Sequence, residues 1–127
     1  VQTATLLHTM GALLEGDHQD AAARRYLMRA LAIQDSVLVG DHPDIAQTLG
    51  TLAQVDAHLG RTAEANEEYA RAVSIYEKAP KENGAALAQV LDAYSRFLQS
   101  SGRSADARAA RAEAESLRTA LAAAPRH

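Results

Sequence analysis

The sequence contains no cysteine and no tryptophan, and only three of its 127 residues are proline. Without cysteine the chain can form neither a disulfide framework nor a thiolate metal site, which fits a reducing compartment. Aromatic residues make up only 4%, and much of the 47% hydrophobic content is alanine. Because alanine has the highest helix propensity and a small side chain, this composition favours an all-helical protein.

Signals of several function classes are also missing. No apolar run approaches the roughly 20 residues of a membrane span, so membrane insertion is not expected. The net charge is −3, and the acidic and basic residues are interspersed, without the basic stripe that is typical of nucleic-acid binding. The chain has no glycine-rich phosphate loop, no HExxH motif and no nucleophile elbow. We therefore expect no catalytic residues, no cofactor and no nucleic-acid partner.

What the sequence does contain is an internal repeat of 42 residues. The segment "AHLGRTAEANEEYARA" at 57–72 aligns without a gap with "QSSGRSADARAARAEA" at 99–114. The alignment pairs Gly60 with Gly102 and Ala65 with Ala107, and the same step backwards from Ala65 reaches Ala23. Three units therefore fill the chain, at approximately 1–39, 40–81 and 82–124.

Each unit is predicted to form two helices. Apolar residues recur at helical spacing on both sides of a turn that contains glycine in the last two units. The stretch "GDHPD" at 40–44 offers an Asp or His cap, a proline near the first helical position and an acidic residue in the first turn. A lone helical hairpin cannot bury both of its apolar stripes, so neighbouring hairpins must share one core. The expected helices lie near 2–15, 19–37, 43–59, 62–78, 84–101 and 104–122.

This pattern resembles the tetratricopeptide repeat family, whose hairpins carry large and small residues at fixed positions. The unit of 42 residues is longer than the common unit of about 34, and it is similar to the kinesin-light-chain subtype. The resemblance implies an all-α fold, a right-handed α-solenoid of three antiparallel helix hairpins in a single domain over 1–127. Asp56 departs from the pattern, which has an aromatic residue there. The residues that carry the resemblance are Leu49, Leu52, Ala53, Ala65, Tyr69 and Ala72 in the second unit, Leu7, Met10, Gly11, Ala23, Leu27 and Ala30 in the first, and Leu91, Tyr94, Ser95, Ala107 and Ala114 in the third.

The resemblance also implies a concave surface lined mainly by the first helix of each unit. Projecting the same helical positions from one unit to the next gives a polar, nearly uncharged groove. Its amide side chains suit an extended or helical peptide, and the alternative is that they are merely solvated helix faces. The predicted partner-binding residues are His8, Gln47, Thr51, Gln54, Gln89, Asp92 and Arg96.

The five histidines raise the question of a metal site. The tripeptide Gly-Asp-His occurs at 16–18 and at 40–42, which are different places in the repeat. A zinc site needs three or four ligands that converge at about 2.0–2.3 Å. Turn formation and N-capping are therefore the favoured roles of these two segments, and no metal site is predicted.

Two positions that face the next repeat become charged in the last unit. Burying unpaired charges is costly, so both are expected to face water, although Arg111 could instead extend its aliphatic stem along a buried neighbour. The third unit is thus predicted to be the C-terminal cap of a longer array, whereas Val1 opens directly into a helical pattern. The two steps run from Leu27 and Tyr69 to Arg111, and from Leu31 and Val73 to Glu115.

Two functional hypotheses result. The first is noncatalytic binding of a protein or peptide in the groove, in a scaffold or adaptor role within a cytoplasmic protein. The Ala- and Arg-rich composition is the basis for expecting a bacterial source. The second is a structural role, in which the repeats form a homo-oligomer through the N-terminal helix.

Overall fold

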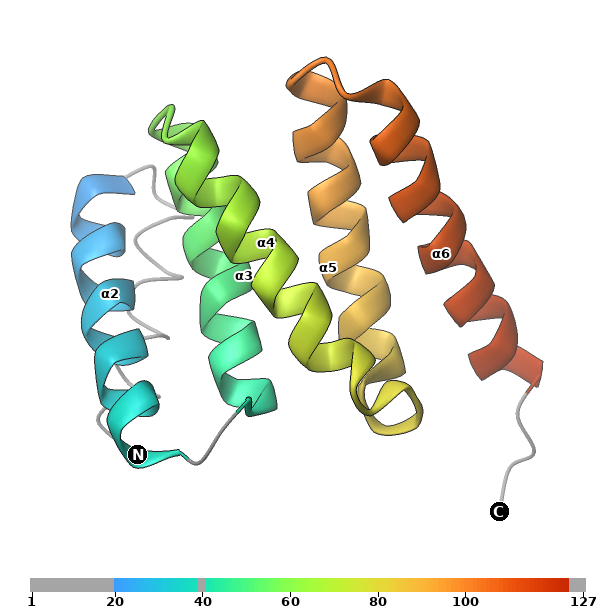
Figure 1. The fold of residues 1–127 in the computed structure, drawn as a ribbon, viewed down its shortest axis with the longest axis horizontal. Helices are drawn as coiled ribbons and strands as arrows, with labels where there is room; N and C mark the ends of the chain where they lie inside the picture. Colours follow the sequence, from blue (N-terminus) through green and yellow to red (C-terminus); the bar gives the residue numbers. More distant parts are fainter. Residues whose placement is uncertain (1–19, 39–40, 124–127) are drawn as a thin grey trace. The chain divides into compact units, whose positions relative to one another are not determined.

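The computed structural model describes residues 20–38 and 41–123, and every regular element in these ranges is an α-helix (Figure 1). The chain divides into two compact units, residues 1–75 and 76–127. The first contains α2 (Asp20–Val37), α3 (Pro43–His58) and nearly all of α4 (Thr62–Glu77). The second contains α5 (Pro80–Ser100) and α6 (Ser104–Ala123). The predicted all-α fold is confirmed, while the expected helix over 2–15 lies outside the described residues.

Helix α3 begins at the start signal that the sequence predicted. The N-cap residue His42 has an extended backbone, and its Nδ1 accepts a hydrogen bond from the backbone N–H of Asp44 at 3.0 Å. Pro43 follows as the first helical residue, and the Asp44 side chain adds negative charge near the positive end of the helix dipole. The N-capping role expected for this histidine is therefore confirmed.

The turns that join α3 to α4 and α5 to α6 share one backbone geometry. Gly60 and Gly102 both have a φ of 80°, a left-handed conformation that glycine adopts without steric cost. The N–H groups of Arg61 and Arg103 donate to the carbonyl five residues earlier, at 2.8 and 2.9 Å. This is the Schellman pattern of helix termination, and it explains why glycine recurs after 42 residues.

Helix α5 begins four residues before its predicted start at 84. Pro80 is its first residue, a position at which the missing N–H of proline leaves no hydrogen bond unmade. Gly84 lies inside the helix and is buried. A Cβ at this position would come 3.3 Å from Cδ2 of Leu121 on α6, so the glycine lets the two helices approach closely. The helix therefore extends four residues beyond its expected start, and Gly84 serves helix packing inside it.

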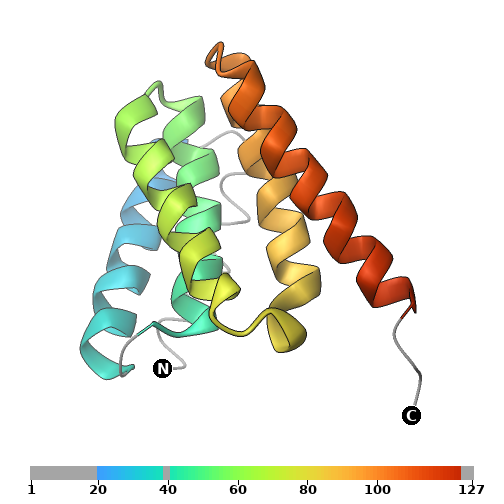
Figure 2. The ribbon, with the colours of Figure 1, turned by 45° about the vertical axis from the view of Figure 1, so that its right-hand side comes forward.

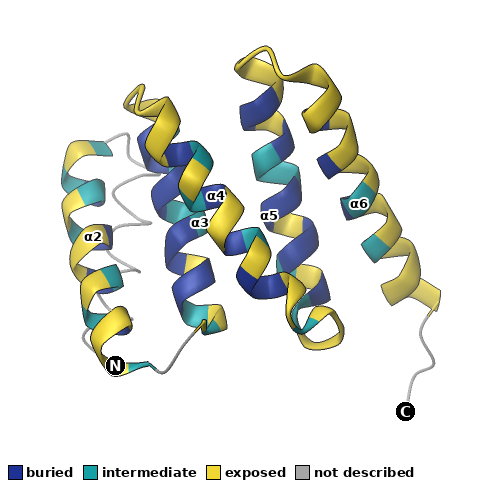
Figure 3. Ribbon diagram, in the orientation of Figure 1, coloured by how far each residue is buried: buried dark blue, intermediate teal, exposed yellow. Residues whose placement is uncertain are grey.

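The small residues that repeat along the sequence are among the most deeply buried. Ala23, Ala65 and Ala107 are each 0% exposed, although they belong to three different helices. Buried residues lie beside exposed ones along each of α2, α4 and α6 (Figure 3). A second alanine, seven residues further along each of these helices, is buried to the same extent as the first. These second alanines are Ala30, Ala72 and Ala114.

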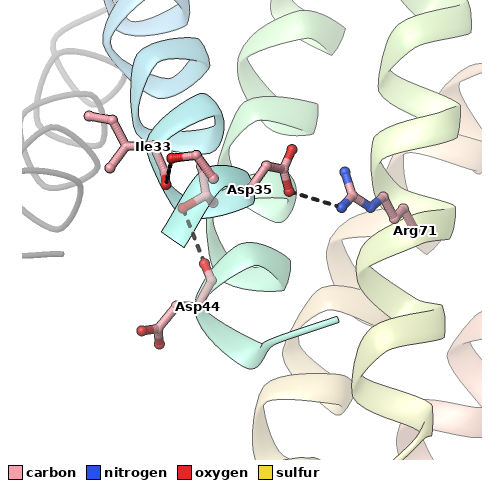
Figure 4. Close-up of polar contacts among 6 residues, drawn as sticks. Ile33, Asp35, Asp44 and Arg71 are labelled. Carbon is pink, nitrogen blue, oxygen red and sulfur yellow. Dashed lines mark hydrogen bonds and ion pairs between the residues drawn. The ribbon is translucent and has the colours of Figure 1, made fainter. Parts of the chain in front are cut away.

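In the first unit, α2 packs against α3 through a small apolar cluster. Ala23 and Leu27 of α2 meet Leu52 and Val55 of α3, and the partly buried Leu31 packs against them. On the surface, Nη2 of Arg71 on α4 donates to Oδ1 of Asp35 on α2 at 3.3 Å (Figure 4). Two helices that are not consecutive in the chain are thus neighbours, as stacked hairpins require.

In the second unit, α5 and α6 form an antiparallel pair (Figures 1 and 2). Leu87, Leu91 and Leu98 of α5 are buried, and the Tyr94 and Phe97 rings stack with centroids 6.3 Å apart. On α6, the two positions that become charged in the last repeat, 111 and 115, are both exposed. Their charges face water, as the cost of burying them predicted.

Replacing Ala65 with leucine tests the close packing at these alanines. Because Ala65 has no exposed surface, the larger side chain must displace its neighbours, and we expect a loss of about 1–3 kcal/mol in the free energy of unfolding. Ala63→Leu is the matched control, since Ala63 lies on the same helix and is exposed. Urea unfolding followed by circular dichroism measures both variants. Equal stability of the two variants would contradict the packing described.

Candidate functional site

The predicted binding residues of the second repeat (40–81) lie along one face of α3. Gln47, Thr51 and Gln54 are spaced by four and three residues, which places them on the same side of the helix. Gln47 is exposed, whereas Thr51 and Gln54 are half-buried. The hydroxyl of Thr51 donates to the carbonyl of Gln47 at 3.1 Å. The two glutamines therefore offer the amide groups of this face.

The corresponding residues of the third repeat (82–124) lie along one face of α5. Gln89, Asp92 and Arg96 follow the same kind of spacing, at offsets of three and four residues. Gln89 and Arg96 are exposed, and Asp92 is half-buried. The α3 residues belong to the first compact unit and the α5 residues to the second. The remaining predicted residue, His8, lies outside the described residues.

Asp92 is held by an arginine from the other helix of its hairpin. The guanidinium of Arg118 on α6 donates hydrogen bonds to both oxygens of the Asp92 carboxylate. Its Nη1 lies 3.4 Å from Oδ1, and its Nη2 bonds to Oδ2. This hydrogen-bonded contact with Arg118 holds the pKa of Asp92 below its ordinary value, and the charges of Arg96 and Arg111 act in the same direction. Asp92 is therefore ionised and already paired at neutral pH.

Projection along the first helices did not find Arg118, because this residue belongs to the second helix of its hairpin. Pairing Arg118 with Asp92 from the sequence would require the antiparallel register of α5 and α6, and the sequence does not fix that register to within one helical turn. The chemistry of the α5 face is accordingly an exposed amide from Gln89 and an exposed guanidinium from Arg96, beside a neutralised ion pair. Such groups can form hydrogen bonds with a polypeptide.

The described part of the chain lacks two other kinds of site. Among residues 20–38 and 41–123, no three His, Cys, Asp or Glu side chains come together in a way that could hold a metal ion. Over the same ranges, no helix is both long and apolar enough to span a bilayer.

The comparison with known families decides what kind of protein this is. The family model described as "Tetratricopeptide repeat" matches residues 2–78. The chain belongs to the tetratricopeptide repeat family. This confirms the resemblance drawn from the alanine and leucine pattern, and the repeat length of 42 residues remains the feature that points to its kinesin-light-chain-like subtype.

Solved structures show the same tetratricopeptide fold. The crystal structure of BtubC (BKLC) from P. vanneervenii superposes with a TM-score of 0.86 at 17% sequence identity. The match covers 98% of this chain and 50% of BtubC, so the chain spans about half the length of that protein. A comparison with curated protein sequences found no match.

The Arg118–Asp92 pair leads to a prediction about ionisation. In the Arg118→Ala variant the pKa of Asp92 should rise toward its ordinary value of 3.8, because the main group that stabilises the carboxylate is gone. Carbon-13 NMR of the side-chain carboxyl measures this directly. Arg108→Ala is the control, since this exposed arginine also lies on α6 and should leave the pKa of Asp92 unchanged. An unchanged pKa in Arg118→Ala would mean that the pair does not form in solution.

Proposed function

We propose that this tetratricopeptide repeat protein is a noncatalytic interaction module that binds a protein or peptide through the polar faces of α3 and α5. Repeats of this family generally mediate protein–protein interaction or scaffolding. The observation that carries the proposal is the exposure of Gln47, Gln89 and Arg96 on the first helices of their hairpins. A scaffold or adaptor role in the cytoplasm of a bacterium belongs to the same proposal, supported by the lack of cysteine and the Ala- and Arg-rich composition.

The proposed binding mode uses amide groups that both donate and accept. A glutamine side chain can pair with the N–H and C=O of an extended peptide, or with polar side chains of a helical one. Arg96 adds five donors and a positive charge. The Arg118 contact with Asp92 compensates the only carboxylate among the predicted residues, so the face does not repel an anionic group of a partner.

The alternative is self-association through the N-terminal helix expected over 2–15, which lies outside the described residues. One observation in the first unit favours a further apolar contact. Met28 and Val37 of α2 are large apolar residues with 41% and 52% exposure. Burial of such side chains against a second copy would release water from apolar surface.

Peptide selection followed by calorimetry tests the primary proposal. Peptides selected from a displayed library on the full chain should bind a monomer. Gln54→Ala and Arg96→Ala should each weaken binding by about fivefold to tenfold, the loss of a hydrogen bond or two. Arg108→Ala controls for the removal of any arginine. Binding that survives both groove variants at full strength would refute the proposed surface.

Light scattering over a concentration series separates the alternative from the primary proposal. A homo-oligomer formed through the first unit should dissociate when Met28 is replaced by glutamate. The same oligomer should be unaffected by Gln54→Ala and Arg96→Ala. A monomer at all concentrations would exclude self-association as the function.

A further inference from the structure

A charged residue lies in the interior of the first unit. Asp56 on α3 is 0% exposed, and a buried carboxylate is unfavourable unless other groups compensate its charge. The positions 42 residues before and after it hold Leu14 and Leu98, and Leu98 is buried at 2% exposure. The middle repeat thus has a carboxyl group at a position that is apolar in the other two repeats.

The first partner of Asp56 comes from α2. Nε of Arg24 donates to Oδ1 of Asp56 at 2.7 Å, and the Arg24 side chain retains 25% exposure. The contact joins residues 32 apart in the sequence. The second oxygen, Oδ2, is buried and receives no hydrogen bond from any described donor. Arg24 therefore compensates the charge but satisfies only half of the carboxylate.

The second partner comes from α4. The carboxyl group of Glu68 lies within hydrogen-bonding reach of Asp56, and its Oε1 is likewise buried without a donor among the described residues. The positions equivalent to Glu68 in the other repeats hold Tyr26 and Ala110. Both members of this carboxyl pair thus replace residues that are not acidic in either neighbouring repeat.

Two ionised carboxylates have only acceptor atoms, so they cannot form a hydrogen bond with each other. A single proton changes this, because a protonated carboxyl group donates through its O–H. Placed between the pair, one proton gives Asp56 a second hydrogen bond and removes one of two like charges. The cluster of Arg24, Asp56 and protonated Glu68 then has no net charge.

The surroundings of Glu68 favour its protonated form. Burial has the largest effect on the pKa of Glu68, followed by the hydrogen bond with Asp56 and the negative charge of Asp56. Repulsion from Glu64 on α4 acts in the same direction and is smaller. Together these effects outweigh the attraction of Arg24 and raise the pKa of Glu68 from 4.5 to about 8. Other charged groups on these helices have contacts of their own. Asp20 on α2 lies 3.8 Å from His58 on α3, and Arg71 on α4 pairs with Asp35.

We propose that Asp56 and Glu68 hold one proton between them, and that this proton, together with Arg24, fastens α4 to α2 and α3 and makes the packing of the first unit dependent on pH. Loss of the proton leaves two adjacent carboxylates that share a single arginine, in a site that solvent only partly reaches. The contact between α3 and α4 is then repulsive. This effect of the shared proton is independent of the proposed partner binding.

The direction of the pH dependence follows from the two states. The unfolded chain releases the Glu68 proton near pH 4.5, whereas the folded unit retains it to about pH 8. Between these values the folded state binds more protons than the unfolded state, so stability falls as the pH rises. One such proton changes the unfolding equilibrium constant by up to about tenfold per pH unit.

Carboxyl NMR on the full chain is the direct test. With carbon-13 in the glutamate side chains, the Glu68 resonance should titrate near pH 8, and that of the exposed neighbour Glu67 serves as the internal comparison. Titration of Glu68 in the range of an ordinary glutamate, near pH 4.5, would overturn the proposal. This measurement needs no variant and so does not depend on any variant folding.

Urea unfolding between pH 5 and pH 9 tests the consequence for stability. Glu68→Gln supplies a permanent N–H donor to Asp56, so its unfolding midpoint should fall less with rising pH than that of the unaltered chain. A double variant, Asp56→Leu with Glu68→Ala, installs the residues of the third repeat and should show the same loss of pH dependence. Glu67→Gln is the matched control and should follow the unaltered chain. Parallel pH profiles for Glu68→Gln and the unaltered chain would contradict a shared proton.

Discussion

Close contact between helices at alanine is the constraint on which the rest of this structure depends. Ala23, Ala65 and Ala107 are completely buried, and a second set of alanines seven residues later is buried to the same extent. A methyl side chain lets two helix backbones approach until their larger neighbours interdigitate, whereas any longer side chain must be accommodated by displacement. Gly84 against Leu121 shows the same requirement in a stricter form. At Ala23 the neighbours include Leu52 and Val55 of α3, so this small residue sets how closely α2 and α3 pack.

Asp56 is a charged residue in this otherwise apolar core, and its neighbours explain how its carboxylate can be buried. Arg24 and Glu68 come from the helices on either side in the chain, so one polar cluster contacts α2, α3 and α4. Replacing a buried ionic cluster by apolar residues is often neutral or stabilising. The third repeat, with Leu98 at the equivalent position, shows that the hairpin does not require the cluster. We therefore expect the Arg24–Asp56–Glu68 cluster to affect how the first unit responds to pH more than how stable that unit is.

Much of the fold could be predicted from the sequence because the determining signals are local. Helical periodicity, the His42–Pro43 start and the turn glycines each act within a few residues, and the structure confirms them. The position of Gly84 inside α5 could not be predicted, because the contact that explains it is with a residue 37 positions away. Arg24 with Asp56 and Arg118 with Asp92 could not be predicted for the same reason. Each pair depends on the rotation of one helix against another, which the spacing of residues within a helix does not specify.

The proposed binding faces consist of the residues of α3 and α5 that are not buried in the core. Once the apolar stripes and the alanines are buried, the first helices have only a narrow polar face, and part of that face is already bonded within the protein. The Thr51 hydroxyl bonds to its own helix, and Asp92 is paired with Arg118. Amides and one arginine are then the groups that we propose for recognition. Such groups match many polypeptides about equally well, because each hydrogen bond to a partner replaces one to water at a small net gain. A partner recognised in this way must therefore engage several of them at once, and affinity would depend on how rigidly each helix holds its own groups in place.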